Sequence, residues 1–153
     1  MIYASTTCGD GYRRKVLDLR RQIFEHIGVE AYAAYSSLLL YPPQWIADNP
    51  DAIAAEEVRA AAQLANVEVH ATRLAAILNF DPRGQLHRIT VPTMVLCAED
   101  DILTPKYFSE EYARLIPKRA HPLGFDGGHA LSRTRPALFN QIAIDFFNGV
   151  AAR

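Results

Sequence analysis

One stretch constrains the fold more than any other: residues 91–105, in which a short apolar run is followed at once by three acids. The apolar residues 93–98 stand between Pro92 and Pro105, and apolar runs of this length bounded by turn formers are typical of buried strands. Such strands are covered on both faces in parallel sheets. Glu99, Asp100 and Asp101 would lie at the carboxyl end, where open α/β sheets bind ligands. The stretch therefore predicts an α/β fold with a candidate site at this strand end.

Most of the other predicted elements are helices. Apolar side chains recur at helical spacing at Val16, Leu19, Ile23, Phe24 and Ile27, which predicts a helix over residues 12–27. Asn49-Pro50-Asp51 opens an alanine-rich helix with a candidate N-cap. Further helices are predicted at residues 29–40, 68–80, 107–116 and from 136 onward. Strands are predicted at residues 1–5 and 120–125, the latter near a sheet edge because Pro122 cannot donate a ladder hydrogen bond.

The predicted helices separate the first strand from the next by many more residues than the usual connection between two such elements contains. We expect one domain over residues 1–153, in which residues 10–88 are a helical insertion that forms a lid over the strand ends. Residues 89–153 would form the core that carries the acids and a histidine loop.

Composition limits the classes of function. A net charge of −1 gives no electrostatic reason to expect nucleic acid or an anionic membrane as a partner. The two cysteines form no disulfide framework, and residues 1–5 lack the features of a signal peptide, so we expect a cytoplasmic protein. His121, Asp126 and His129 lack the dense spacing of a metal site, and no cofactor is expected.

The acids have a candidate partner downstream. His129 follows Gly127 and Gly128, and a glycine-rich backbone can bring an imidazole close to a neighbouring strand end. A carboxylate that orients an imidazole is the acid–base part of a hydrolytic triad, and the chain order of acid then histidine fits that arrangement. The alternative for the three acids is a solvated charged turn.

The residues 98–105 resemble the acid motif of the α/β-hydrolases, and Gly127-Gly128-His129 is similar to the histidine loop of that family. The resemblance implies the C-terminal half of an α/β-hydrolase fold, with about three parallel strands, flanking helices and a helical lid. It also implies that Asp101 is the triad acid and His129 the base. A more specific resemblance is to the aminoacrylate hydrolases of pyrimidine utilisation, which implies hydrolysis of a small ester, enamine or carbamate. Its matching stretches are residues 40–46, 55–57, 73–74, 101–105, 127–130 and 139–140.

Two residues of the predicted lid are candidates for substrate binding. Trp45 could line a pocket there, although aromatic side chains at helix ends are more often part of the core. Arg73 could hold a substrate carboxylate through two parallel hydrogen bonds, the alternative being an ordinary surface arginine.

The sequence departs from the α/β-hydrolase pattern in one respect that bears on activity. It contains no Gly-x-Ser-x-Gly nucleophile elbow, and none of its five serines has the matching context. We therefore expect the chain alone to be inactive and to need an N-terminal half for its small-molecule substrate. We also expect a homo-oligomer or a complementing chain at the sheet edge near residues 1–5. The alternative is an inactive truncated fragment or an association module.

Overall fold

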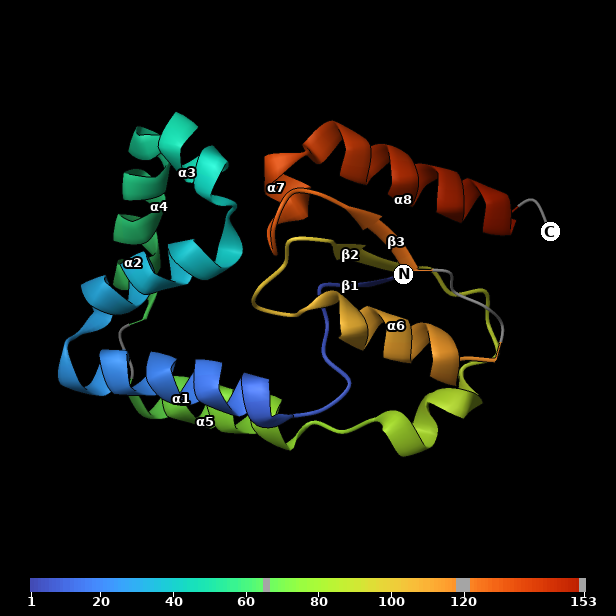
Figure 1. Ribbon diagram of the computed structural model, residues 1–153, viewed down its shortest axis with the longest axis horizontal. Coiled ribbons are helices and arrows are strands. Elements are labelled where there is room, and N and C mark those ends of the chain that lie inside the picture. The colour runs from blue at the N-terminus through green and yellow to red at the C-terminus, as the bar shows by residue number, and fades with distance from the viewer. Residues whose placement is uncertain (65–66, 118–121, 152–153) are drawn as a thin grey trace. The chain divides into compact units, whose positions relative to one another are not determined.

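The structure is a computed structural model that describes residues 1–64, 67–117 and 122–151 (Figure 1). The chain forms two compact units. The sheet unit comprises Met1–Thr7 and Pro82–Arg153, and the helical unit comprises Cys8–Asp81. A 3-10 helix spans Arg83–Arg88 and belongs to the sheet unit. The lid role of residues 10–88 stays a prediction.

The sheet unit is built on three parallel strands, β1 (Ile2–Tyr3), β2 (Val95–Ala98) and β3 (Pro122–Phe125), in the order β1-β2-β3. In this register Leu96 pairs with Tyr3 on one side and with Leu123 on the other. All four residues of β2 are buried, which explains why the strand is apolar throughout. Within the described residues β3 is paired on one side only, as Pro122 predicts. Residues 120–121 of the predicted strand lie outside the described residues.

Helices flank this sheet. Helix α6 (Lys106–Leu115) packs on β2, where Tyr112 and Ile116 join Leu86 and Val95 in the hydrophobic core. Figure 1 shows α8 (Pro136–Ala151) on the other side of the sheet, preceded by the short α7 (Leu131–Thr134). The prediction of a small parallel sheet with flanking helices is confirmed.

The helical unit contains α1 (Gly11–His26), α2 (Val29–Leu40), α3 (Pro43–Asp48), α4 (Pro50–Gln63) and α5 (Val67–Asn79). Helix α1 packs on α2 and α5, and α2 packs on α4. Asp10 caps α1 by accepting a hydrogen bond from the Arg13 amide at 2.8 Å. Gly28, at φ 127°, allows the turn between α1 and α2 that few other residues would adopt.

Two local details of the helical unit differ from what the sequence patterns suggest. Asn49 stands at the N-cap of α4, but its side chain makes no capping bond and donates instead to the Trp45 carbonyl at 2.8 Å. Leu19 and Ile27, which belong to the apolar spacing that predicted the first helix, are 44% and 72% exposed. Val16 and Phe24 of the same apolar set are buried. Helical periodicity therefore located α1 correctly but overstated the width of its packed stripe.

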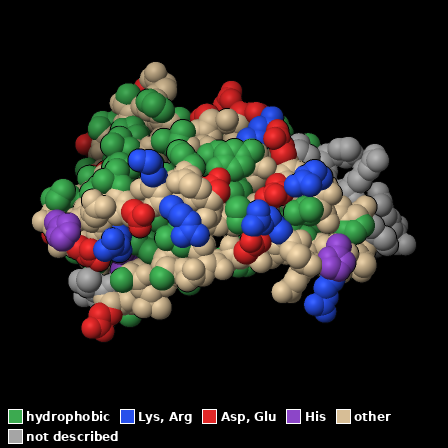
Figure 2. Space-filling model, turned by 60° about the horizontal axis from the view of Figure 1, so that its bottom comes forward, with side chains coloured by type: hydrophobic (Ala, Val, Ile, Leu, Met, Phe, Trp, Pro, Cys, Tyr) green, Lys and Arg blue, Asp and Glu red, His purple; other side chains and the backbone are tan. Residues whose placement is uncertain are grey.

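The surface carries both signs of charge. On the face shown in Figure 2, the basic and acidic side chains that are drawn in colour are interspersed. No helix in the described part of the chain has the length and apolar character needed to span a bilayer.

Candidate active site

The three acids after β2 have three different environments. Glu99 is exposed and forms an ion pair with Lys106 at 2.8 Å. Asp100 accepts hydrogen bonds from the backbone amides of Gly127 and Gly128 at 2.9 and 2.8 Å. The Asp101 side chain is fully buried. Consecutive residues thus separate into a solvated acid, an acid that anchors the histidine loop and an acid enclosed by hydrogen-bond donors.

The buried Asp101 carboxylate is held by the loop that follows it. Its Oδ1 atom accepts from the amides of Leu103 and Thr104, both at 2.8 Å, and its Oδ2 atom accepts from the Thr104 hydroxyl at 2.7 Å. Short aspartate side chains favour such bonds to the backbone two and three residues ahead. Donors on both oxygens offset the cost of burying the group and fix its orientation.

His129 meets this carboxylate through one ring nitrogen. Its Nδ1 atom lies 3.0 Å from Asp101 Oδ2 and 3.1 Å from Thr104 Oγ1. The Thr104 hydroxyl already donates to Asp101, so both neighbours of Nδ1 act as acceptors. This network assigns the ring proton to Nδ1 and leaves the Nε2 lone pair free. The imidazole is 20% exposed, so it can reach a bound molecule.

The backbone of the histidine loop depends on glycine. Gly127 and Gly128 have φ angles of 154° and 69°, which residues with a Cβ atom rarely adopt. A Cβ atom on Gly127 would also lie 2.5 Å from Leu131 Cδ1. Thr134 Oγ1 donates to the Gly127 carbonyl at 2.7 Å and closes the loop onto α7.

Tyr3 of β1 holds the same loop from the other side. Its hydroxyl donates to the His129 carbonyl at 2.5 Å and accepts from the Ser132 amide at 3.3 Å. Burial raises the pKa of Tyr3, so the phenol keeps the proton that this bond requires. The ring packs edge-on against Phe139 at 5.0 Å between centroids. The sequence patterns did not single out Tyr3 or Thr104, although the Asp-x-x-Thr spacing was a signal for Thr104. They placed Asp100 among the candidate acids but did not predict that it would hold the histidine loop.

We expect Asp100→Ala to loosen the histidine loop. Hydrogen bonds to a charged group contribute about 1.5–3 kcal/mol each, and about 1.4 kcal/mol is a factor of ten in an equilibrium. Amide hydrogen exchange at Gly127 and Gly128 should therefore be at least about tenfold faster in the variant. Asp100→Asn keeps an acceptor oxygen and is the matched control, with a smaller expected effect. Unchanged exchange in Asp100→Ala would contradict the anchoring role.

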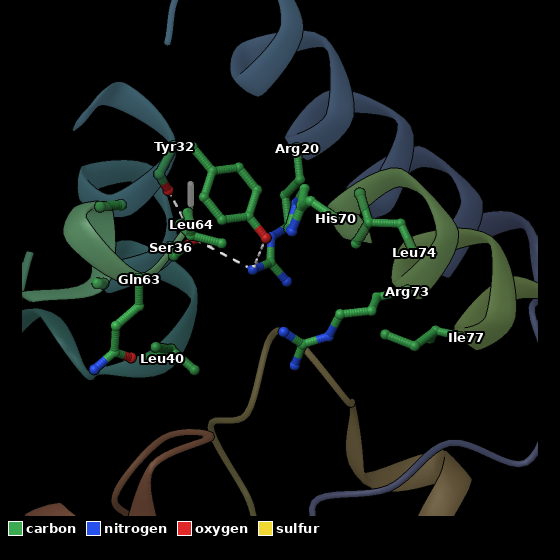
Figure 3. Close-up of a pocket in the computed structure, with 12 residues that line it drawn as sticks. Arg20, Tyr32, Ser36, Leu40, Gln63, Leu64, His70, Arg73, Leu74 and Ile77 are labelled. Carbon is green, nitrogen blue, oxygen red and sulfur yellow. Dashed lines mark hydrogen bonds between the residues drawn. The ribbon is translucent and has the colours of Figure 1, made fainter. Parts of the chain in front are cut away.

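The two predicted substrate-binding residues lie in the helical unit. Trp45 is half-buried and stacks on Tyr41, with ring centroids 4.6 Å apart, while the Tyr41 hydroxyl donates to Glu56 at 2.6 Å. Arg73 lines a cavity between the helices, and Trp45 is not among the residues that line it (Figure 3). The structure therefore brings Asp101 and His129 into contact. Substrate binding by Trp45 and Arg73 stays a prediction.

Among the described residues, no group of three or more His, Cys, Asp or Glu side chains is placed to hold a metal ion. His121, one of the residues considered for a metal site, lies outside the described residues.

Comparison with solved structures defines the class of protein. The chain superposes on the α/β-hydrolase MGS-M2 from a deep-sea metagenome library with a TM-score of 0.85 and 17% identity, covering 95% of this chain and 54% of that one. It superposes on the enol-lactonase from Burkholderia xenovorans with a TM-score of 0.78 and 21% identity, covering 88% and 51%. The chain therefore has the fold of the C-terminal half of an α/β-hydrolase.

Sequence comparison identifies more specific relatives. The chain is 36% identical over 137 residues to the putative carbamate hydrolase RutD of Azorhizobium caulinodans, covering 90% of this chain and 52% of the relative. It is also 36% identical to the putative carbamate hydrolase RutD of Yersinia enterocolitica, covering 90% and 49%. The chain thus spans about half the length of these curated relatives. No protein-family model matches the sequence.

Proposed function

We propose that Asp101 and His129 are the acid and base of a Ser-His-Asp hydrolase that acts on a small ester, enamine or carbamate. The observation that carries the proposal is the 3.0 Å contact between His129 Nδ1 and the buried Asp101 carboxylate. The relatives named as carbamate hydrolases support this substrate class. Substrate contacts by Trp45 and Arg73 are part of the same proposal.

The geometry suits general-base chemistry at Nε2. With its proton on Nδ1, the imidazole can take the proton of a serine hydroxyl as that oxygen attacks the carbonyl carbon of an ester or carbamate substrate. Asp101 then stabilises the imidazolium, which returns the proton to the leaving group. Water would repeat the same steps to release the acyl or carbamoyl group from the serine.

We propose that the nucleophile comes from outside these 153 residues. Among the described residues, the His129 ring is hydrogen-bonded to Asp101 and Thr104 and to no serine hydroxyl. In the sheet unit, the Ser5 hydroxyl is 3.1 Å from Tyr112 Oη, and Ser109 is buried in α6. Neither has the strand–turn–helix context of a nucleophile elbow.

Among the described residues, β1 pairs with no strand on the side away from β2, and this edge offers a place for the missing part to pair. Ile2 and Ala4 donate their amides to Met94 and Leu96, so the alternation of a strand directs the backbone groups of Tyr3 away from β2. Unpaired strand edges attract further strands. This edge supports completion by an N-terminal half, and it equally supports a second reading in which the chain is an inactive module that associates with a copy of itself.

The test is a chimaera in which the N-terminal half of the Azorhizobium caulinodans relative precedes Met1. We expect the chimaera to hydrolyse a p-nitrophenyl ester and to react with a fluorophosphonate probe, and the 153-residue chain to do neither. His129→Ala in the chimaera should lower turnover at least about a thousandfold. Labelling of a serine in the chain alone, or an active His129→Ala chimaera, would contradict the proposal. If the folded chimaera is inactive, the association module is the better reading.

A further inference from the structure

A second candidate site lies within the helical unit. Helices α1, α2, α4 and α5 line an open cavity of about 380 Å³, which is in the range of small-molecule sites (Figure 3). Half of the residues lining it are aliphatic, and none is acidic. The polar residues are Arg20, Tyr32, Ser36, Gln63, His70 and Arg73.

Arg20 brings an uncompensated charge to this cavity. Its Nη2 atom donates to the Tyr32 hydroxyl and to Ser36 Oγ, the latter at 3.2 Å, and its guanidinium lies 4.8 Å from the centre of the Tyr32 ring. All of these partners are neutral. The Nε atom of Arg20 is buried, and no described residue forms a hydrogen bond with it. Burial lowers the pKa of Arg20, as expected for a cation removed from water without an anion beside it.

His70 supplies a second unsatisfied group. It is only 7% exposed and packs against Phe24 and Tyr32, with ring centroids 4.6 and 4.5 Å apart. Its Nε2 atom is buried and has no hydrogen-bond partner in the part of the chain that the structure describes. Burial, followed by the nearby cations Arg20 and Arg73, lowers the pKa of His70. Buried polar atoms are rarely left unpaired in proteins, so this atom marks a position where a hydrogen-bonding ligand would be favoured.

Arg73 adds a second guanidinium. It lies three residues after His70 on α5, so the two side chains share a face of the helix. Figure 3 shows the guanidinium groups of Arg20 and Arg73 both directed into the open centre of the cavity. The Tyr32 hydroxyl accepts from Arg20 and so has its own proton available for a ligand. Burial raises the pKa of Tyr32, which keeps that proton in place.

We infer that this cavity binds a small monocarboxylate, with the carboxylate between Arg20 and Arg73 and a short apolar tail against Leu40, Leu74 and Ile77. A guanidinium matches a carboxylate through two parallel hydrogen bonds. The aliphatic half of the lining favours an anion with an apolar part over an inorganic one. Arg73 is also a substrate contact in the proposed hydrolase, but binding of a monocarboxylate here needs only the residues of this cavity and not the hydrolytic chemistry.

The test is equilibrium binding to the 153-residue chain, measured by calorimetry and by the NMR signals of the His70 ring, at constant ionic strength. The probes are propionate, its neutral analogue propionamide, and inorganic phosphate. We expect propionate to bind saturably and to shift the His70 signals. Propionamide should bind at least about tenfold more weakly, because it lacks the charge that the arginines recognise. Equal binding of propionate and propionamide would overturn the inference, and tighter binding of phosphate would overturn the carboxylate class.

A pair of variants localises the binding. Arg73 is exposed, so Arg73→Gln should leave the fold intact while weakening propionate binding at least about tenfold. Arg59→Gln is the matched control, because Arg59 is an exposed arginine on α4 that does not line the cavity. The affinity of the Arg59→Gln variant for propionate should stay within about twofold of the affinity of the unchanged chain. Equal weakening in both variants would show non-specific attraction and overturn the inference.

Discussion

Replacing Asp101 by asparagine is expected to lower kcat about 10⁴-fold in the chimaera that supplies the nucleophile. The asparagine oxygen can still accept from the amides of Leu103 and Thr104, so the loop should keep its shape. Its amide nitrogen would replace Oδ2 and donate toward His129 Nδ1. The imidazole would then carry its proton on Nε2. A protonated Nε2 atom cannot accept the proton of a serine hydroxyl.

The control for this variant is Glu99→Gln in the same acidic turn. Glu99 is exposed and paired with Lys106, so its loss should change kcat by less than about twofold. The tautomer can be measured on the 153-residue chain itself from the ring nitrogen signals of His129. We expect the proton on Nδ1 in the unchanged chain and on Nε2 in Asp101→Asn. A change in kcat below tenfold, or a proton on Nε2 in the unchanged chain, would contradict the proposed role of Asp101.

The largest expected effect on stability belongs to Leu96, the centre of β2. Leu96 is 0% exposed. Its strand is paired with β1 on one side and with β3 on the other. Truncating a fully buried leucine removes its burial free energy and leaves a cavity, which together cost about 2.7–5 kcal/mol. Leu96→Ala should lower the free energy of unfolding by this amount in urea denaturation monitored by circular dichroism.

Leu123 provides a control with the same change of side chain. It is the register partner of Leu96 on β3 but is 39% exposed. Leu123→Ala should therefore cost about 1 kcal/mol or less, because much of its surface already meets water. Equal losses for the two variants would show that β2 is not the centre of the core.

Local patterns predicted much of the fold. The apolar run before Glu99, helical spacing from Val16 to Phe24, and Pro136 at the start of the last helix located elements that the structure contains. These signals are short-range, because periodicity and turn residues act over one or two turns of chain. The same signals did not predict that Leu19 and Ile27 would be exposed, since exposure depends on which helices pack against α1.

The candidate site shows the same division. The sequence by itself determined an acidic strand end, a glycine-flexed loop with His129, and the absence of a nucleophile elbow. Through resemblance it also singled out Asp101. Only the tertiary structure gave Asp100 its bonds to the histidine loop and directed the Tyr3 hydroxyl to the His129 carbonyl. Adjacent aspartates are chemically alike, so their environments differ only because the folded backbone points their side chains in different directions.

The cavity between the helices was decided by tertiary structure alone. Arg20 comes from α1, Tyr32 from α2, and His70 and Arg73 from α5, with no motif that connects them in the sequence. Their shared electrostatic environment exists only because α1 packs against α2 and α5. The sequence therefore determined which elements form and which residues can carry chemistry. Packing decided which of those residues meet, because the contacts that unite a site join residues distant along the chain.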